Sequence, residues 1–469
     1  MQYKKPVAIV SIKNNSFLFA SEIKSLLAHP MITPIVSKDG LSEIFVMGPA
    51  RTPGHGVFKD ISEIKPGYCM MVDKNGCHTK RYWSLISKPH NESLESTIES
   101  VRELVYDAIK RQLVSDVPLG TMLSGGLDSS AITAIATEVY KDPIQTFSVD
   151  YTGNDVNFHK NEFQPDPDAP WAKIVSEYLA TKHHIHYIDT PQLTDALFKA
   201  VQARDLPGMT DVDSSLYLFC SEIKKHVPIA LSGEGADEVF GGYPWFYRKE
   251  LQDSNTFPWS RRAKERFEFY SPELLDLIKP TEYMEHRYME ALDEVPRLKS
   301  DTAANDRSRE LFYLNLTRWM PTLLDRNDRM STAARLNVRT PFCDHRLVEY
   351  LWNVPWEYKF YMNREKGLLR KALTGILPED VLWRKKSPYP KTHNPDYLNA
   401  VRSLLIKVLE DKSSPLLHFV VADKLKDFAL SVTPQTNIPW FGQLMNAPQM
   451  LAYFVQVEYW LREYNVKLE

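Results

Sequence analysis

Residues 121–130 place two glycines, several hydroxyls and one carboxylate between a short apolar run and a helical pattern. Gly125 and Gly126 can adopt backbone angles that are closed to other residues, so successive N–H groups can point into one concavity. This concavity opens at the N-terminus of the next helix, where partial positive charge favours an anion. Further donors are the hydroxyls of Ser124, Ser129 and Ser130. The segment therefore predicts a phosphate-binding loop.

One carboxylate, that of Asp128, lies within this loop. It would repel phosphate unless a hard cation lay between the two, so the loop implies Mg²⁺. The pattern G-x-x-x-x-G-K-[ST] is absent and no lysine follows the glycines, which indicates chemistry other than γ-phosphate transfer. The alternative interpretation is a tight strand-to-helix turn that merely needs glycine.

A second glycine loop follows another apolar, strand-like run, and this loop is acidic. Glu234 stands between Gly233 and Gly235, which would let its carboxylate approach a ligand closely. Asp237 is placed to hold Mg²⁺ together with Asp128. The alternative is an acidic turn exposed to solvent.

Three consecutive cations, Arg384, Lys385 and Lys386, begin a proline-rich loop after a helical pattern. Such a loop suits the stabilisation of negative charge on an electrophile. The alternative is a basic turn in solvent.

These loops need a scaffold that brings them together. Strand-like runs alternate with helical patterns, which indicates an α/β fold with a doubly wound parallel sheet. The strands are expected at 121–123, 143–150, 184–188 and 227–231, and the helices at 94–113, 131–140 and 172–179. Because ligands bind at the carboxyl ends of such strands, Val149 should lie beside the phosphate loop. A helical C-terminal part is expected after residue 395.

The first 85 residues have a different, α+β pattern of short strands and turns. Strands are expected at 7–12 and 16–20, a helix at 22–29 and a hairpin turn at 73–76. Residues 85–95 are expected to form a linker. The predicted domains are therefore 1–85 and 95–469.

Composition excludes several classes of protein. The 469 residues are 43% hydrophobic, which is enough for two or three domains with a sizeable core. A net charge of -3 gives no general attraction to nucleic acid, and no apolar stretch is long enough to predict a membrane span. The four cysteines are scattered, so buried free thiols are expected rather than disulfides or a zinc site. A cytoplasmic protein is expected.

The phosphate loop resembles the pyrophosphate-binding (PP) loop of the ATP pyrophosphatase group. The acidic loop narrows the choice among the families of that group. Residues 232–242 resemble the second loop of class B, glutamine-hydrolysing asparagine synthetases and their β-lactam-forming relatives. Residues 319–350 resemble a helical stretch of that family ending in R-x-P-F-x-D, and residues 17–27 resemble the later part of its glutaminase domain. The resemblance implies a PP-loop type sheet preceded by part of an Ntn-type glutaminase sandwich.

The resemblance also implies roles for individual residues. Glu234 would act as the base on incoming ammonia, and Lys386 would contact the α-phosphate region, with Lys385 as the neighbouring alternative. Asp128 and Asp237 would bind the metal. ATP contacts are expected from Met122, Ser124, Gly125, Gly126, Asp128, Ser129, Ser130, Val149, Ser232 and Gly233.

Two arginines in the 319–350 stretch have two open interpretations. Arg329 and Arg339 could contact an anion, or they could be buried structural residues paired with Asp325 and Asp344. They are therefore not included among the predicted catalytic residues.

The N-terminal domain departs from the family pattern. Class B enzymes begin with a nucleophilic cysteine in a sandwich about twice as long, whereas the first cysteine here is Cys69. A truncated glutaminase domain is therefore expected, without glutaminase activity. The exposed edges and apolar face of half a sandwich would need covering, so a homodimer or another association is expected.

The resemblance as a whole predicts a ligase that uses ATP and Mg²⁺ to form asparagine from aspartate and ammonia through β-aspartyl-AMP. Glutamine would serve only if another chain supplied a glutaminase. Two alternatives remain: a related synthetase that closes a β-lactam or peptide macrolactam, and a noncatalytic subunit that stabilises a partner.

Overall fold

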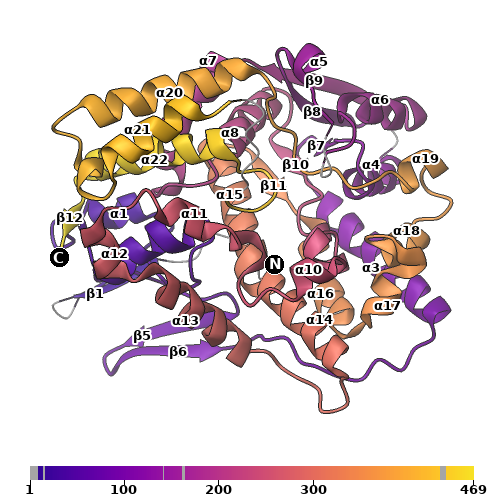
Figure 1. Ribbon diagram of the computed structural model, residues 1–469. Helices are drawn as coiled ribbons and strands as arrows, with labels where there is room; N and C mark the ends of the chain where they lie inside the picture. The colour runs from indigo at the N-terminus through magenta and orange to yellow at the C-terminus, as the bar shows by residue number, and fades with distance from the viewer. Residues whose placement is uncertain (1–8, 14–15, 141, 161–163, 434–439) are drawn as a thin grey trace.

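Five parallel strands form the central sheet, in the order β11-β10-β7-β8-β9 (Figure 1). Their bounds are β7 Leu119–Met122, β8 Gln145–Tyr151, β9 Lys182–Ile188, β10 Ile229–Leu231 and β11 Asn337–Arg339. The structure is a computed structural model that describes residues 9–13, 16–140, 142–160, 164–433 and 440–469. The predicted parallel sheet is thus present.

The strand order reverses between β7 and β10, which are neighbours in the sheet. Connections from two such strands diverge, and open α/β sheets bind ligands at this point. The phosphate loop follows β7 and the acidic loop follows β10, so both lie where the sheet opens.

β11 differs from expectation, because the resemblance implied a helical stretch through residue 339. Residues 337–339 instead pair in parallel with β10 at the edge of the sheet. This pairing joins segments more than 100 residues apart, so no local pattern in the sequence could predict it.

The predicted helix at 94–113 is α3, Leu94–Leu113. Ser93 caps it by accepting a hydrogen bond from the backbone N–H of Ser96, and its buried face includes Val101 and Val105. The helix packs against α4, Leu127–Val139, and α18, Gly367–Ala372.

Helices make up most of the remaining structure (Figure 1). Those that follow β8, β9 and β10 are α5 Asn154–Asn157, α6 Ala169–Tyr178, α7 Thr190–Arg204, α8 Asp211–Lys224 and α9 Ala236–Phe240. The next group is α10 Lys249–Gln252, α11 Ala263–Phe267, α12 Pro272–Ile278, α13 Pro280–Asp293, α14 Ala303–Leu314 and α15 Met320–Ala333. The last group is α16 His345–Asn353, α17 Trp356–Lys359, α19 Glu379–Leu382, α20 Pro395–Glu410, α21 Ala422–Ser431 and α22 Ala447–Glu463. No helix in the described ranges is long and apolar enough to cross a membrane.

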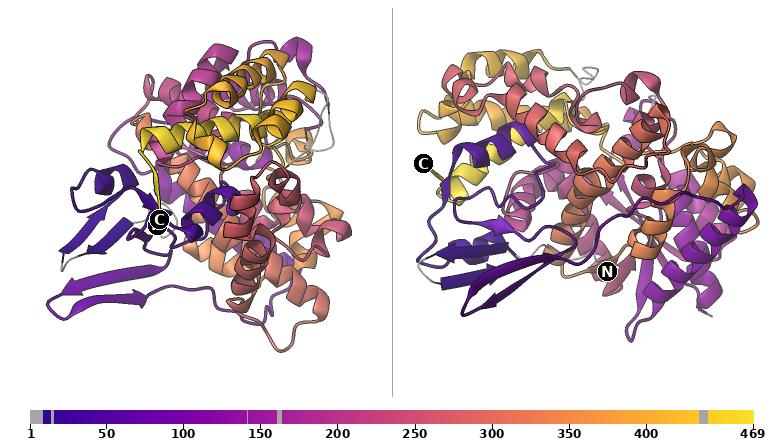
Figure 2. Two further views of the ribbon diagram at one scale, coloured as in Figure 1. Left: turned by 60° about the vertical axis from the view of Figure 1, so that its left-hand side comes forward. Right: turned by 90° about the horizontal axis from the view of Figure 1, so that it is seen from below.

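The N-terminal strands project from one side of the molecule (Figure 2). β1 Ile9–Lys13 lies between β2 Ser16–Ala20 and β4 Ser62–Glu63 in an antiparallel sheet, and β5 Tyr68–Asp73 forms a hairpin with β6 Gly76–Arg81. The predicted strands, the hairpin and the short helix α1 Ile23–Leu27 are present, although Val7 and Ala8 lie outside the described residues. Cys69 is exposed, so the expectation of buried thiols is wrong there.

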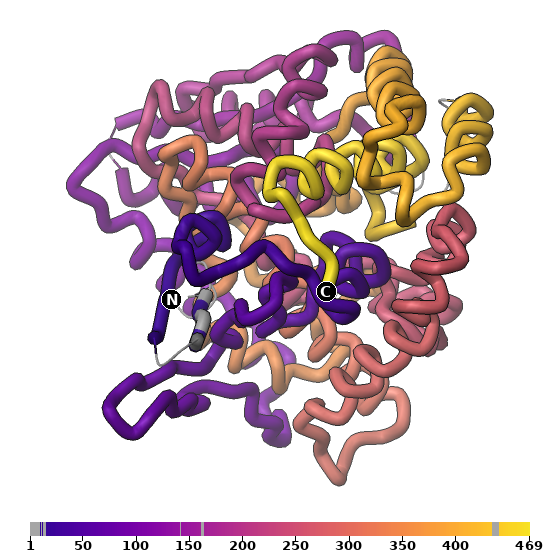
Figure 3. The backbone as a smooth tube through the Cα atoms, turned by 90° about the vertical axis from the view of Figure 1, so that its left-hand side faces the viewer, coloured from indigo at the N-terminus to yellow at the C-terminus, as the bar shows by residue number. Residues whose placement is uncertain are grey.

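The N-terminal segment also contacts the end of the chain. β3 Ile35–Val36 pairs in parallel with β12 Lys467–Leu468, and Figure 3 shows the C-terminal end running down to the indigo N-terminal segment. α2 Lys38–Ser42 leads into a π-helical turn, Glu43–Met47, that is wholly buried.

Candidate active site

The phosphate loop runs from the end of β7 into α4, as the sequence predicts. Ser124 and Ser129 hold its shape, because their hydroxyls lie 3.1 Å apart and the Ser129 hydroxyl donates to the Gly126 carbonyl at 3.2 Å. Gly125 has φ 71°, and a Cβ atom there would come within 2.5 Å of Trp171. Glycine is therefore required at this turn both for its backbone angle and for its small size.

The acidic loop touches the phosphate loop directly. A Cβ atom added to Gly233 would lie 3.0 Å from the Cβ atom of Asp128, closer than ordinary packing allows. The missing side chain thus permits the close approach that places Asp128 and Asp237 in one site.

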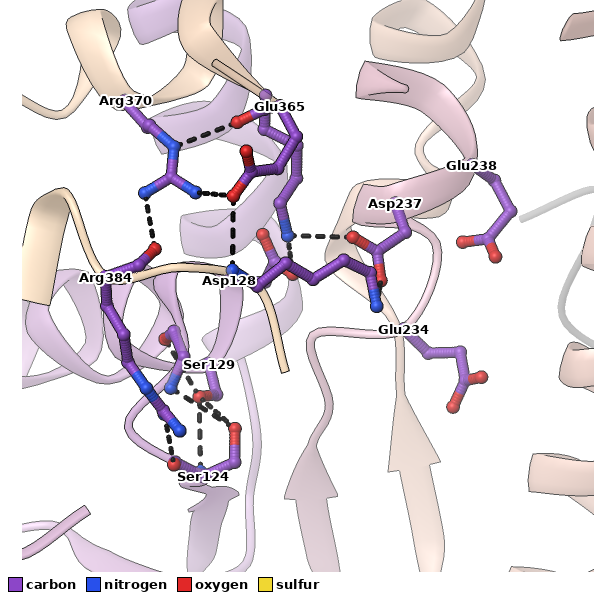
Figure 4. Close-up of polar contacts among 12 residues, drawn as sticks. Ser124, Asp128, Ser129, Glu234, Asp237, Glu238, Glu365, Arg370 and Arg384 are labelled. Carbon is purple, nitrogen blue, oxygen red and sulfur yellow. Dashed lines mark hydrogen bonds and ion pairs between the residues drawn. The ribbon is translucent and has the colours of Figure 1, made fainter. Parts of the chain in front are cut away.

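A lysine lies between these two carboxylates (Figure 4). The Nζ atom of Lys366 is 2.7 Å from Asp128 Oδ2 and 2.8 Å from Asp237 Oδ1, and Lys386 Nζ is 3.1 Å from Asp237 Oδ2. Burial alone would raise the pKa of Asp237, but the two lysines outweigh it and lower that pKa to about 2. Both lysines therefore face a carboxylate that is ionised at neutral pH.

Lys366 occupies the position between Asp128 and Asp237 where the sequence analysis expected Mg²⁺. The pair nevertheless fits a magnesium ion that also binds phosphate oxygens, because Asp128 Oδ1 is buried without a hydrogen-bond partner among the described residues. Mg²⁺ is often held by only one or two carboxylates together with substrate phosphates. The two residues could thus share the ion with a bound nucleotide.

The carboxylate of Glu234 points away from this ion-pair cluster (Figure 4). Its Oε2 atom lies 3.5 Å from Arg326 Nη2 and 3.4 Å from Asn327 Nδ2, both on α15. Glu238 is buried nearby, and burial with the charge of Asp237 raises the pKa of Glu238 to about 8. Glu238 is therefore mainly protonated at neutral pH, which leaves Glu234 as the carboxylate available on this side.

These groups line one cavity with a volume of about 240 Å³. Of the predicted residues, those in its wall are Met122, Ser124, Gly126, Asp128, Ser129, Val149, Ser232, Gly233, Glu234, Asp237, Lys385 and Lys386. Gly125 and Ser130 do not line it, because Gly125 packs against α6 and Ser130 is fully buried on α4. The cavity therefore joins the phosphate loop to a carboxylate that lies outside the lysine cluster.

A family model described as asparagine synthase matches residues 100–462. The chain belongs to the asparagine synthase family. A second model, described as a glutamine amidotransferase domain, matches residues 3–83 of this family member.

Relatives in Bacillus subtilis and Methanocaldococcus jannaschii support the membership of this chain in the asparagine synthase family. "Asparagine synthetase [glutamine-hydrolyzing] 3" is 49% identical over 462 residues, which are 97% of this chain and 75% of the relative. "Asparagine synthetase [glutamine-hydrolyzing] 1" is 30% identical over 82% of this chain and 64% of its own length. A putative asparagine synthetase 2 of Methanocaldococcus jannaschii is 30% identical over 49% of this chain and 43% of its own length.

A set of buried contacts holds the Lys386 loop of this asparagine synthase family member against the phosphate loop. Arg384 pairs with Asp168 at 2.7 Å and donates to the Ser124 carbonyl at 3.2 Å. Glu365 Oε1 accepts from the backbone N–H of Lys386 at 3.1 Å and from Arg370 at 2.9 Å. The loop is thereby anchored on both sides of its lysine.

Lys385 and Lys386 differ in their surroundings. Lys386 is half-buried, with Nζ 5.0 Å from the centre of the Tyr243 ring, whereas Lys385 is exposed. The geometry thus favours Lys386 as the cation that faces the phosphate side of the cavity.

Sequence reasoning missed Lys366, Arg326, Arg370 and Asp168. Lys366 has φ 54° and stands just before the short helix α18, in a stretch with no glycine loop or strand to mark it. The only available signal was the position of a lysine immediately before a helix, which many surface lysines share.

Arg329 and Arg339, for which the sequence allowed either an anion contact or a structural role, make structural contacts. Arg329 pairs with Asp325 at 3.1 Å, as one interpretation expected. Arg339 instead donates to the backbone carbonyls of Gln112 and Val114, so its pairing with Asp344 was wrong. Asp344 pairs with Arg346, because Asp344 caps the N-terminus of α16 and Arg346 lies in the first turn of that helix.

Proposed function

We propose that the chain uses ATP to convert the side-chain carboxylate of aspartate into the amide of asparagine, with release of AMP and pyrophosphate. The observation that carries this proposal is one cavity that holds the phosphate loop, two lysines and the carboxylate of Glu234. Membership of the asparagine synthase family and the printed activity of the relatives support the choice of aspartate.

In the proposed first step, a β-carboxylate oxygen of aspartate attacks the α-phosphorus of ATP. The bond from that phosphorus to the pyrophosphate oxygen breaks, which gives β-aspartyl-AMP and pyrophosphate. Ser124, Gly126 and Ser129 receive the pyrophosphate, and Lys366 and Lys386 balance its charge. Asp128 and Asp237 would hold Mg²⁺, which supplies further charge neutralisation when bound.

In the proposed second step, ammonia attacks the carbonyl carbon of β-aspartyl-AMP. The bond to the AMP oxygen breaks, AMP leaves, and Glu234 takes the proton that the new amide nitrogen loses. Its position outside the ion-pair cluster supports this role, since a carboxylate neutralised by lysine would be a poor base (Figure 4).

We propose that free ammonia is the nitrogen donor in the reaction of this chain. Residues 1–68 contain no cysteine, and Cys69 is exposed on the β5 strand rather than held in a cavity with a base. Supplying ammonium and glutamine in separate reactions tests this proposal, and turnover with glutamine alone would contradict it.

The decisive experiment uses the Glu234→Gln variant with ATP, Mg²⁺, aspartate and ammonium. Pyrophosphate release should continue, because the first step needs no base at this position, whereas asparagine formation should fall by about 100-fold or more. Pyrophosphate assay and amino-acid analysis of the same reactions measure both. Full asparagine synthesis by this variant would reject the role of Glu234, and absence of aspartate-dependent pyrophosphate release by the unmodified protein would reject the proposed function.

A further inference from the structure

Arg326 lies in the cavity wall beside Glu234. It belongs to α15 and is only 4% exposed. Its guanidinium carbon lies over the Tyr389 ring, 5.4 Å from the ring centre, which is a cation–π contact. A permanent positive charge is thus held rigidly next to the proposed base.

The contacts of this charge are incomplete. Its Nη2 atom is 3.5 Å from Glu234 Oε2, which is longer than a good hydrogen bond, and its buried Nε atom has no hydrogen-bond partner among the described residues. A buried guanidinium is costly unless an anion pairs with it and its N–H groups are satisfied. The geometry therefore leaves room for a second carboxylate.

Among the described residues, five other cations line the cavity: Arg370 pairs with Glu365, Lys385 is exposed beside Lys386, and the remaining three have partners on the phosphate side. Lys366 and Lys386 contact Asp128 or Asp237, and Arg384 contacts Asp168 and the Ser124 carbonyl. Because Glu234 must reach the ammonia that attacks the acyl carbon, the rest of the acid substrate extends past Glu234. Arg326 is the cation in the cavity wall that contacts the Glu234 carboxylate.

We propose that Arg326 binds the α-carboxylate of the amino-acid substrate and thereby selects aspartate over acids that lack this group. This inference rests on the proposed function and assigns its substrate specificity to one residue. Arginine suits the task because its fork of N–H groups can bind a carboxylate through two parallel hydrogen bonds.

Another explanation is that Arg326 only orients Glu234. The two roles differ in how they depend on substrate. Loss of a residue that orients Glu234 would slow amide formation from every substrate. Loss of a residue that binds the α-carboxylate would affect only substrates that carry this group. Adenylation alone, which precedes the action of Glu234, should be insensitive to an orienting role.

The test is ATP–pyrophosphate exchange, which measures adenylation without ammonia. Aspartate is compared with β-alanine, the same molecule without its α-carboxylate. The unmodified protein should prefer aspartate by about 100-fold in kcat/KM, since a buried charged group is left unpaired by β-alanine. In Arg326→Leu the kcat/KM for aspartate should fall by about 100-fold, whereas the kcat/KM for β-alanine should change by less than about threefold. The preference for aspartate then disappears.

Two further variants guard the interpretation. Asn327→Leu removes the other contact of Glu234 but no charge, so it should keep the preference for aspartate. Arg326→Lys preserves the charge in case the leucine variant fails to fold, and it should raise KM for aspartate about tenfold with KM for ATP unchanged.

Two results would overturn the inference. The first is an unchanged preference for aspartate in an active Arg326→Leu variant. The second is an Arg326→Lys variant in which the KM for ATP rises by as much as the KM for aspartate. Failure of the unmodified protein to adenylate aspartate would overturn the proposed function together with it. These failures are distinguishable because the first two occur in a protein that still adenylates aspartate.

Discussion

Lys366 is the side chain on which the charge balance of the site depends. Replacement by methionine would leave Asp128 and Asp237 buried side by side, with only Lys386 as a close cation. We expect Lys366→Met to lower aspartate-dependent pyrophosphate release by about 100-fold or more and to reduce the free energy of unfolding by about 3–5 kcal/mol. Pyrophosphate assay and urea denaturation measure the two effects.

Lys371→Met is the matched control for this change, because Lys371 is an exposed lysine on α18. Its effect on the free energy of unfolding should stay within about 0.5 kcal/mol. Equal effects of the two variants on pyrophosphate release would contradict the position assigned to Lys366.

Asp237 should give the stability a defined pH dependence. Its folded-state pKa of about 2 lies below the ordinary value of 3.8, so its ionised form contributes stability above pH 4 that is lost as the pH falls toward 2. The difference in unfolding free energy between the protein and Asp237→Asn should therefore be about 1 kcal/mol smaller at pH 3 than at pH 6. Urea denaturation at both pH values measures it, and a difference that grows on acidification would have the wrong sign.

Local pattern decided which residues could be predicted. Ser124, Asp128 and Glu234 were found because glycine loops after strands are visible over about ten residues of sequence. Lys366 and Arg326 were missed because their partners are far away along the chain, at Asp128 and Glu234. The same limit explains why the pair Arg329 and Asp325, on one helix turn, was anticipated, whereas the contacts of Arg339 were not.

At the level of elements, amphipathic spacing predicted a helix at about residues 94–113, which is α3, because its buried face is a local feature of the sequence. The strands β7 and β8 were also expected. The order of the sheet and the edge strand β11 were not predicted, since pairing with β10 depends on the whole intervening chain.

The Lys386 loop offers an element-scale prediction, because Arg384 anchors it through Asp168. Arg384→Met should leave Asp168 buried and unpaired, at a cost of about 3–5 kcal/mol in unfolding free energy. Adding Asp168→Asn should recover much of that stability but not pyrophosphate release, because the loop remains detached from the Ser124 carbonyl. Urea denaturation and pyrophosphate assay of the single and double variants test this, and recovery of activity in the double variant would contradict it.

Across the whole molecule, the N-terminal segment is part of the common core rather than an appendage. Tyr453 of α22 is 1% exposed and donates to the Ile44 carbonyl at 2.7 Å. Tyr453→Phe should therefore lower the free energy of unfolding by about 1–3 kcal/mol, since a buried carbonyl loses its donor. Tyr459→Phe, on the same helix, removes a hydroxyl that accepts a hydrogen bond from Gln202 Nε2 at 2.6 Å, but this site is only half-buried, so the loss should be smaller, at about 0.5 kcal/mol.

Urea unfolding followed by tryptophan fluorescence measures both changes. Limited proteolysis of the tyrosine variants adds a regional readout, because weakened docking should expose residues 43–47 first. Equal stability of the two variants would indicate that the Ile44 contact contributes little.

The pairing of β3 with β12 has a consequence for how the protein is made. Val36 leaves the ribosome about 430 residues before Lys467, so at 5–20 residues per second roughly 20 to 90 s separate the two partners. Over that interval β3 cannot form this strand pair and must remain unaggregated beside the growing chain. The N-terminal segment therefore waits for residues synthesised more than 400 positions later before its folding is complete.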